Sequence, residues 1–372
     1  MKDPLLRFGS AAAAPGRKAW GQLLVRKGRR LVRIPTAVIH GARSGRHVVL
    51  VASQHGGEVN GFEAVRRFVE AVDPRRVCGT IFAVPSANPE AAVRGKQALD
   101  ERRPDAPGIG YSTPYNMNHL WPGRRGGSLV ARVVHEIWTR AVLAPHAKAS
   151  LVLDLHCHGG PSAVYAADEA SVILGTATGL RHVFHTRASQ APKGRKLVHG
   201  SLEAACQREG IHALTLELGR QFELVPSSIR EGERAIANLL FAAGVLPGKP
   251  HYEGPAFIHD PWHDHFEKPD RKRPSFWMPH ARHRGIVLFH KCDGDLVRKD
   301  EVVCEVMDPF RARVVEIHRS GISGVFSGRR LPLAEGVIVG AACVPGGPLC
   351  VIAKLRRADP AVAARRVPLL LP

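Results

Sequence analysis

The chain has 372 residues, and its 53 Lys and Arg against 33 Asp and Glu give a formal net charge of +20. With 44% hydrophobic residues, 37 Gly and 28 Pro, the composition is typical of a folded globular protein. It excludes coiled-coil, collagen-like and wholly disordered chains, and no apolar run is long enough to span a membrane.

The positive charge is concentrated at the two ends of the chain. Residues 1–46 contain 11 Lys or Arg and one acid, and residues 354–372 contain 5 and one, so 14 of the 20 surplus charges lie there. No zinc-finger spacing or aromatic RNA-binding motif accompanies them, and aromatic residues make up only 6% of the chain. We therefore interpret the ends as solvated basic segments and expect neither a nucleic-acid nor a membrane partner.

The cysteines and the amino-terminal segment bear on where the protein resides. The 7 cysteines are odd in number and include no C-x-x-C pair, which favours a reduced chain. Near the amino end, Pro15 and Arg17 interrupt the alanine run before an apolar segment forms, unlike in a signal peptide. The sequence thus predicts a cytoplasmic location.

Apolar patterns of strand and helix type alternate from residue 47 onward. Residues 47–53 form a short apolar run typical of a buried strand, and apolar residues at helical spacing follow between Phe62 and Val72. Ser228 and Glu231 are spaced as a capping box, which predicts the start of a later helix. Further strand-like runs lie at 80–85, 150–156 and 212–219, and further helical patterns lie at 128–141 and 228–244.

This alternation predicts an α/β fold with a mixed, mostly parallel sheet covered by helices on both faces. After Gly244 the helical periodicity stops, and from residue 275 onward short strand-like runs punctuated by Gly predict a small carboxyl-terminal all-β domain. We therefore predict a basic amino-terminal extension packed on the main domain (1–46), the α/β domain itself (47–246), a connection (247–274) and the small β domain (275–372).

Three motifs that carry chemically active side chains fall at the carboxyl ends of predicted strands. His55-Gly56-Gly57-Glu58 follows the first strand, Asp154-Leu155-His156 ends a second, and Glu217 lies near the end of a third. In an open α/β sheet, ligands bind beyond these strand ends. We therefore expect the three motifs to meet in one site.

The residue types in these motifs are those of a hydrolytic zinc site, which needs three protein ligands and one open position. His55 and Glu58 are one helical turn apart, and the glycines between them allow a tight turn close to a metal. His156 would supply the third ligand for one Zn²⁺ per chain. Asp154, on the same face of that strand, would orient a metal-binding side chain without itself contacting the metal.

Glu217 is our candidate general base. A carboxylate within Leu-Thr-Leu-Glu-Leu-Gly is costly to bury unless it has a partner, and metal-activated water is a suitable one. Each motif alone has an ordinary explanation: a chance H-x-x-E, a core histidine, or a glutamate in a structural ion pair. The combination of the three at strand ends favours the zinc hydrolase.

The motifs H-G-G-E-V-N-G, S-A-N-P-E-A-A, N-H-L-W-P-G, D-L-H and T-L-E-L-G occur in this order over residues 45–245. Together they resemble the succinylglutamate desuccinylase/aspartoacylase family, relatives of the zinc carboxypeptidases. The small β domain agrees with that family's layout. The resemblance implies a zinc exopeptidase-like fold, zinc ligation by His55, Glu58 and His156, and activation of water by Glu217.

The resemblance also implies substrate-binding positions. The family's arginine nine positions beyond Asn88 corresponds to Gln97 here, and its later Asn-Arg pair corresponds to Asn118 and His119. We assign substrate binding to Gln97, Asn118 and His119. A guanidinium offers a permanent charge and a planar fork, whereas glutamine is neutral and histidine is charged only when protonated. Nearby arginines that would supply a displaced charge are Arg94, Arg102, Arg103, Arg124 and Arg125.

The sequence therefore predicts a zinc-dependent hydrolase of linear amides that removes the acyl group from an N-acyl amino acid or a related small amine. Two alternatives stay open: a carboxypeptidase-like peptidase, and a catalytically silent zinc-binding scaffold, because Gln97 and His119 stand at two arginine positions. The expected partner is a small-molecule substrate, with a homo-oligomer as an open alternative.

Other residues compete less well for a role. His158 is an alternate metal ligand or a supporting donor, and Cys157 is expected to pack rather than act as a nucleophile. The histidine-rich run 259–265 has no predicted element to fix its geometry and is expected to be an exposed loop. No G-x-S-x-G motif or phosphate-binding loop occurs.

Overall fold

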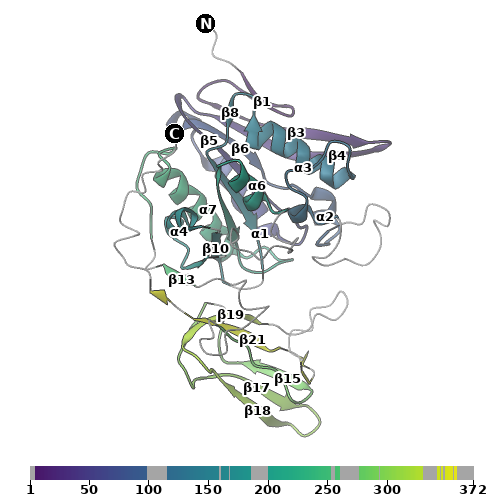
Figure 1. Ribbon diagram of the computed structural model, residues 1–372, viewed down its shortest axis with the longest axis vertical. Helices are drawn as coiled ribbons and strands as arrows, with labels where there is room; N and C mark the ends of the chain where they lie inside the picture. Colours follow the sequence, from purple (N-terminus) through teal and green to yellow (C-terminus); the bar gives the residue numbers. More distant parts are fainter. Residues whose placement is uncertain are drawn as a thin grey trace.

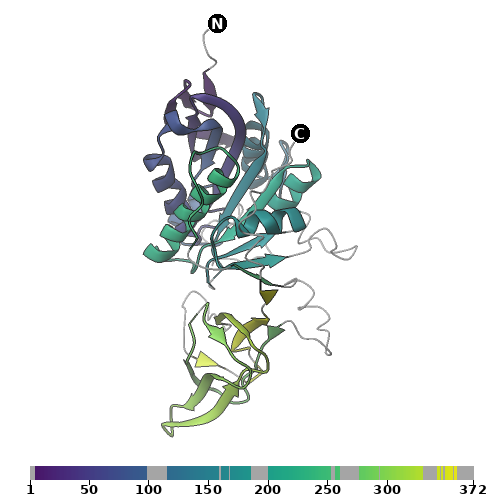
Figure 2. The same cartoon turned by 90° about the vertical axis from the view of Figure 1, so that its left-hand side faces the viewer.

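The structure is a computed structural model that consists of a large α/β portion with a smaller β portion at one end (Figures 1 and 2). The predicted α/β class is confirmed at the level of a mixed α/β fold built on one large mixed sheet. The residues described are 5–98, 115–158, 161–166, 168–185, 200–252, 256–259, 276–292, 294–329, 342–343, 345–346, 348–354 and 356–357.

The large sheet has 10 strands in the order β22-β13-β11-β10-β12-β9-β5-β6-β4-β3. Its centre, β6-β5-β9-β12, is parallel, and antiparallel pairs flank that centre on both sides. The strands are Arg17–Lys27 (β3), Arg30–His40 (β4), Arg43–Ala52 (β5), Cys78–Val84 (β6), Leu151–His156 (β9), Ala163–Ala166 (β10), His182–His185 (β11), His212–Glu217 (β12), Phe257–His259 (β13) and Arg356–Arg357 (β22).

The helices connect these strands, and four of the six described helices begin at a side-chain cap. Ser128 caps its helix by accepting a hydrogen bond from the Ala131 backbone N–H, as the sequence indicates. The predicted capping box at Ser228 and Glu231 is wrong, because that helix already begins at Pro226. The helices are Val59–Ala71 (α1), Pro89–Val93 (α2), Leu129–Ile137 (α3), Glu169–Thr176 (α4), Leu202–Arg208 (α6) and Pro226–Ala242 (α7), with short helical turns at Pro74–Arg76 (η1), Met117–His119 (η2) and Trp138–Val142 (η3).

Both faces of the sheet are buried, which follows from the alternation of side chains along each strand. In β5, Val48 and Leu50 join a core with α1, α4 and α7, whereas Val49 and Val51 join a second core with α3 and α6. In β9, the leucines face the first core. Val152 and Asp154, which lie between these leucines, therefore face the other side.

The basic amino-terminal region takes part in the large sheet, although the sequence analysis assigned no strand to it. β3 and β4 form a long antiparallel pair, and β4 joins the sheet by pairing with β6. Lys18 on β3 donates from Nζ to three carbonyls at the end of α1, and Arg46 on β5 donates to the Ala243 carbonyl at the end of α7. Two of the basic residues thus satisfy helix carboxyl ends and complement their dipoles.

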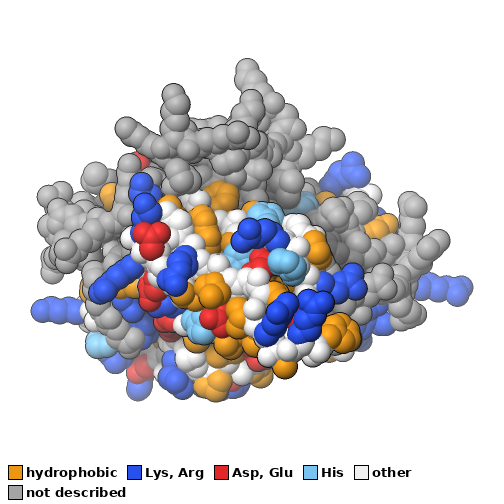
Figure 3. All heavy atoms as spheres, turned by 90° about the horizontal axis from the view of Figure 1, so that it is seen from below, with side chains coloured by type: hydrophobic (Ala, Val, Ile, Leu, Met, Phe, Trp, Pro, Cys, Tyr) orange, Lys and Arg blue, Asp and Glu red, His pale blue; other side chains and the backbone are white. Residues whose placement is uncertain are grey.

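The small β portion contains two 4-stranded antiparallel sheets, β14-β21-β19-β16 and β18-β17-β15-β20, around a core of its own. Figure 3 views the molecule from this end, where Lys and Arg are interspersed with hydrophobic and acidic side chains. The residue boundaries of the four predicted parts stay predictions. The strands are Phe276–Trp277 (β14), Gly285–Phe289 (β15), Leu296–Val297 (β16), Val302–Asp308 (β17), Arg313–Arg319 (β18), Gly324–Arg329 (β19), Ala342–Cys343 (β20) and Cys350–Lys354 (β21).

Two further strand pairs complete the described elements, Leu6–Phe8 (β1) with Ala11–Ala13 (β2), and Leu143–Ala144 (β7) with Ala147–Lys148 (β8). Within the described part of the chain, no helix combines the length and the hydrophobicity that crossing a bilayer requires.

Candidate active site

Two histidines and one glutamate meet at the carboxyl ends of β5 and β9. His55 and Glu58 lie in the turn from β5 into α1, and His156 is the last residue of β9, the parallel neighbour of β5. His55 Nδ1 lies 2.9 Å from Glu58 Oε1, and His156 Nδ1 lies 2.6 Å from Glu58 Oε2. We call these three residues the trio. They are 1–2% exposed, and one ligand atom from each lies within 4.8 Å of the others.

The two glycines of the turn allow this approach because the turn packs closely against neighbouring segments. A side chain on Gly56 would collide with the backbone of Ala91 and Ala92, and one on Gly57 would collide with the ring of Phe222. The H-G-G-E motif therefore needs small residues for steric reasons. This is the local reason why the chain can place His55 and Glu58 side by side.

A neighbouring polar group holds the outer nitrogen of each histidine. His55 donates from Nε2 to Asn116 Oδ1 at 2.9 Å, and His156 donates from Nε2 to Asp154 Oδ2 at 3.0 Å. Each ring thereby presents Nδ1 to the centre of the trio, as metal-binding histidines do when a second group fixes their tautomer. Asp154 lies where the sequence analysis expects the orienting residue, whereas Asn116 was not identified from the sequence.

The charges of the trio are strongly coupled. Burial raises the pKa of Glu58, but His55 and His156 lower it by more, so the net pKa lies below its usual range. Burial lowers the pKa of His156, but Asp154 and Glu58 raise it well above the usual value. A buried, ionised carboxylate between two imidazoles attracts a cation strongly. Two ring nitrogens and one carboxylate oxygen also match the donor set of a catalytic zinc site.

Glu217 lies beside the trio. It is the last residue of β12, and it faces His156 in the parallel pairing of β12 with β9. Its Oε2 is buried and has no hydrogen-bond partner among the residues that the structure describes. Burial raises the pKa of Glu217 well above its usual range, opposed by His156 and reinforced by Glu58 and Asp154. An unpaired carboxylate with a high proton affinity is suited to accept and release a proton.

Of the predicted substrate-binding residues, Gln97 contacts the trio directly. It donates from Nε2 to Glu58 Oε1 at 3.2 Å, and its buried Oε1 has no partner within the described ranges. Asn118 and His119 lie in η2, beside Asn116. Burial and the proximity of His55 lower the pKa of His119. The structure therefore brings all three substrate-binding candidates to the surroundings of the trio.

Gln221 is a contact of the trio that the sequence analysis missed. It donates from Nε2 to Glu58 Oε1 at 3.1 Å and to the Cys157 carbonyl at 2.7 Å. It lies in the irregular segment after β12, where no motif or periodicity distinguishes it. Only the packing of that segment against the turn after β5 reveals it.

The competing candidates have surroundings that do not favour a role in the chemistry. Cys157 is buried in the first core, and burial raises the pKa of its thiol, which disfavours a thiolate nucleophile. The ring of His158 lies edge-on to Tyr165, with 5.9 Å between ring centroids. Arg94, Arg124 and Arg125 are exposed, whereas Arg102 and Arg103 lie outside the described residues, as does the run 259–265 apart from His259.

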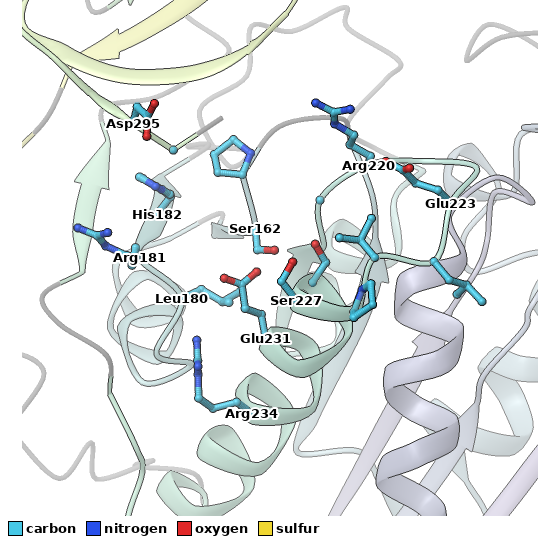
Figure 4. Close-up of a pocket in the computed structure, with 17 residues that line it drawn as sticks. Ser162, Leu180, Arg181, His182, Arg220, Glu223, Ser227, Glu231, Arg234 and Asp295 are labelled. Carbon is cyan, nitrogen blue, oxygen red and sulfur yellow. The ribbon is translucent and has the colours of Figure 1, made fainter. Parts of the chain in front are cut away.

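A separate cavity of about 660 Å³ adjoins Gly219, two residues beyond Glu217 (Figure 4). Its wall combines residues near the start of α7 with residues 180–182 at the start of β11, and Asp295 lines it from the small β portion. None of the predicted site residues lines it. Its charged lining residues are Arg181, Arg220, Glu223, Glu231, Arg234 and Asp295.

The trio of two histidines and one glutamate lies at the edge of a mixed α/β sheet and could hold a metal ion, and Glu217 lies beside it with one oxygen that has no hydrogen-bond partner among the described residues. Residues 44–243, more than half of the chain, match the family described as the succinylglutamate desuccinylase/aspartoacylase catalytic domain. The chain belongs to this family, and the resemblance inferred from its motifs is confirmed.

Individual relatives agree with this membership. The chain is 27% identical over 326 residues to the N-alpha-acetyl-L-2,4-diaminobutyric acid deacetylase of Halomonas elongata, covering 84% of this chain and 83% of the relative. A succinylglutamate desuccinylase from Silicibacter sp. superposes with a TM-score of 0.68 at 20% identity, covering 96% of this chain and 100% of that one. The product-bound ectoine utilization protein EutE of Ruegeria pomeroyi gives 0.67 at 19% identity, covering 95% and 99%. At such identities the structural likenesses establish the fold.

Proposed function

We propose that this protein is a zinc-dependent hydrolase that removes the acyl group from a small N-acyl amino acid or a related amine. The observation that carries the proposal is the buried trio and, beside His156, Glu217, whose Oε2 has no hydrogen-bond partner in the described part of the chain. Membership of a family of deacylases and the 27% identity to an N-acetyl-diaminobutyrate deacetylase support the cleavage of an acyl–amine bond.

The residues of the trio fit a zinc ion in number, type and charge. His55 and His156 would bind through Nδ1, because Asn116 and Asp154 engage their Nε2 atoms, and Glu58 would bind through its carboxylate. Zinc bound there supplies a Lewis acid that polarises the amide carbonyl and lowers the pKa of water. The fourth position would remain open to the reaction.

The side chains around the trio have separable tasks in this proposal. Glu217 accepts the proton of the attacking water and passes it to the leaving nitrogen, because its Oε2 is unpaired and its proton affinity is high. Gln97, Asn118 and His119 contact the substrate. Because these side chains are neutral, they would bind an amide or an uncharged part of the substrate by hydrogen bonds and would not form an ion pair with a carboxylate.

The test combines metal analysis with a substrate screen on the wild type and on Glu58→Gln. The wild type is expected to contain about one zinc per chain and to deacylate N-acetyl or N-succinyl derivatives of small amino acids and diamines. Glu58→Gln preserves size but removes the negative ligand, so both zinc and turnover should be lost. Cleavage of peptides alone would indicate the peptidase, zinc without any amide cleavage would indicate the silent scaffold, and a zinc-free wild type would contradict the proposal.

A further inference from the structure

A chain of buried hydrogen bonds runs from the second core to the trio. Trp121 donates from Nε1 to Gln54 Oε1 at 2.7 Å, and Gln54 donates from Nε2 to Asp154 Oδ2 at 2.6 Å. The same Asp154 oxygen accepts the Nε2–H of His156 at 3.0 Å, and His156 Nδ1 faces Glu58. Trp121, Gln54, Asp154 and His156 are all at most 3% exposed. These contacts are therefore shielded from bulk solvent.

The two hydrogen-bond partners of the Gln54 side chain, Trp121 and Asp154, permit only one orientation of its amide. An indole only donates hydrogen bonds, and an ionised carboxylate only accepts them. The amide oxygen must therefore face Trp121, and the amide nitrogen must face Asp154. Asp154 Oδ1 is buried and has no partner among the described residues, so Oδ2 alone takes both hydrogen bonds. Gln54 thus selects the carboxylate oxygen that holds His156.

Rigid surroundings hold the far end of this chain. Trp121 packs edge-on against Trp138 in the second core, with 6.3 Å between ring centroids, and its backbone N–H donates to the Gly200 carbonyl. Gln54 immediately precedes His55 in the sequence. Its side chain therefore connects the turn that carries two members of the trio to the strand that carries the third.

We propose that Gln54 and Trp121 are positioning residues of the metal site. Trp121 orients the Gln54 amide, Gln54 orients Asp154, and Asp154 keeps the proton of His156 on Nε2, so that Nδ1 offers its lone pair to the metal. This inference rests on the proposed function only in requiring that the trio bind zinc. Neither residue touches the reacting atoms.

The test measures zinc affinity without using turnover. The zinc dissociation constants of metal-free wild type, Trp121→Phe, Gln54→Leu, the double variant and Trp138→Phe are obtained by competition with a chromophoric chelator. Trp121→Phe removes the indole N–H from the chain of hydrogen bonds. Trp138→Phe is the matched control, because it makes the same change to the ring that packs on Trp121 in the same core. Thermal unfolding of each metal-free variant verifies that it is folded.

We expect Gln54→Leu to weaken zinc binding by about tenfold and Trp121→Phe by roughly threefold to tenfold, as for residues that support a ligand from behind. Trp138→Phe should bind zinc like the wild type. The double variant should be no weaker than Gln54→Leu, because the indole acts only through the amide. In the Co²⁺-loaded proteins, the visible absorption bands should shift for the Gln54 and Trp121 variants and stay unchanged for Trp138→Phe.

Equal losses of zinc affinity in Trp121→Phe and Trp138→Phe would overturn the inference, because general packing would then explain both. An effect of Trp121→Phe that persists undiminished in the Gln54→Leu background would also overturn it. If Gln54→Leu does not fold, the comparison of the two tryptophan variants still decides. A wild type that binds zinc but cleaves no amide contradicts only the proposed function, whereas one that binds no zinc contradicts both.

Discussion

Glu217 and His156 stand opposite each other at the ends of two adjacent parallel strands, β12 and β9. Because side chains of paired residues in parallel strands lie on the same face, this register places the Glu217 carboxylate beside His156. Glu217 Oε2 has no hydrogen-bond partner among the described residues, and burial raises the pKa of this carboxyl although His156 opposes the rise. Metal binding by His156 and proton transfer by Glu217 are therefore roles that can be tested separately in this pair.

Glu217→Gln should lower kcat by about 10²–10⁴-fold and leave the zinc dissociation constant within a few-fold of the wild type. The amide keeps the shape of the carboxylate but accepts no proton. Steady-state kinetics on the best amide from the screen, together with zinc titration, check this. Glu223→Gln, an exposed position in the segment after β12, is the matched control and should behave as wild type. Parallel loss of zinc and kcat in Glu217→Gln would instead assign Glu217 to metal binding.

His119→Arg should shift the substrate preference toward N-acyl amino acids with an acidic side chain. The guanidinium adds a permanent charge and a planar fork where the half-buried imidazole now stands, beside Asn118 and near His55. We expect kcat/KM for acidic relative to neutral substrates to rise about 10–100-fold, the range of a charge-assisted hydrogen bond.

His119→Lys provides the control for charge without the fork, and it should give a smaller shift. Substrate competition between acetyl-aspartate and a neutral acetyl-amino acid measures the ratio directly. An unchanged ratio in both variants would mean that residue 119 does not contact the substrate side chain.

The buried His47 should make the fold lose stability in mild acid. His47 accepts from Thr80 at Nδ1 and donates from Nε2 to the Ala141 carbonyl, and the ring of His146 lies 4.6 Å away. Burial, partly offset by these hydrogen bonds, lowers the pKa of His47 from 6.5 to about 4. Between pH 4 and 6.5 the imidazole of His47 is protonated in the unfolded chain but neutral in the folded chain. The free energy of unfolding therefore rises with pH in this range, and this stability is lost as the pH falls from about 6.5 to 4.

The expected size of this loss is about 3 kcal/mol in the free energy of unfolding. Urea denaturation of wild type and His47→Gln at pH 7 and at pH 4 measures it, because the variant lacks this titration. The stability of the wild type relative to the variant should fall by that amount on acidification. Parallel changes in the two proteins would show that His47 stays neutral or stays charged throughout the range.

Lys18→Met should destabilise the fold by about 1 kcal/mol, because the three carbonyls at the end of α1 lose their shared donor and the helix dipole loses a positive charge. Methionine retains most of the side-chain length, so the packing of the aliphatic part is preserved. Lys249→Met removes a charge from an exposed position and should change stability by less than about 0.5 kcal/mol. Equal effects in the two variants would mean that net charge, and not capping, determines the result.

The sequence by itself determined the main features of the site. Short continuous apolar runs locate β5, β9 and β12, and apolar residues at helical spacing locate α1 and α3, since local patterns reflect which sides of an element are buried. The trio and Glu217 all fall at the ends of these runs, and parallel strands bring such ends to one edge. The family follows from the same motifs.

Only the tertiary structure revealed the contacts that orient the trio. Gln54, Asn116 and Gln221 belong to none of the quoted motifs, and Trp121 lies within N-H-L-W-P-G but has no role that the motif assigns. The hydrogen-bond partners of these four residues lie 61 to 163 residues away. The pairing of β4 with β6 and the helix-capping roles of Lys18 and Arg46 likewise depend on distant segments. Periodicity reports the burial of a residue, but a hydrogen-bond partner is chosen by the folding of the whole chain, and that choice sets the geometry of this site.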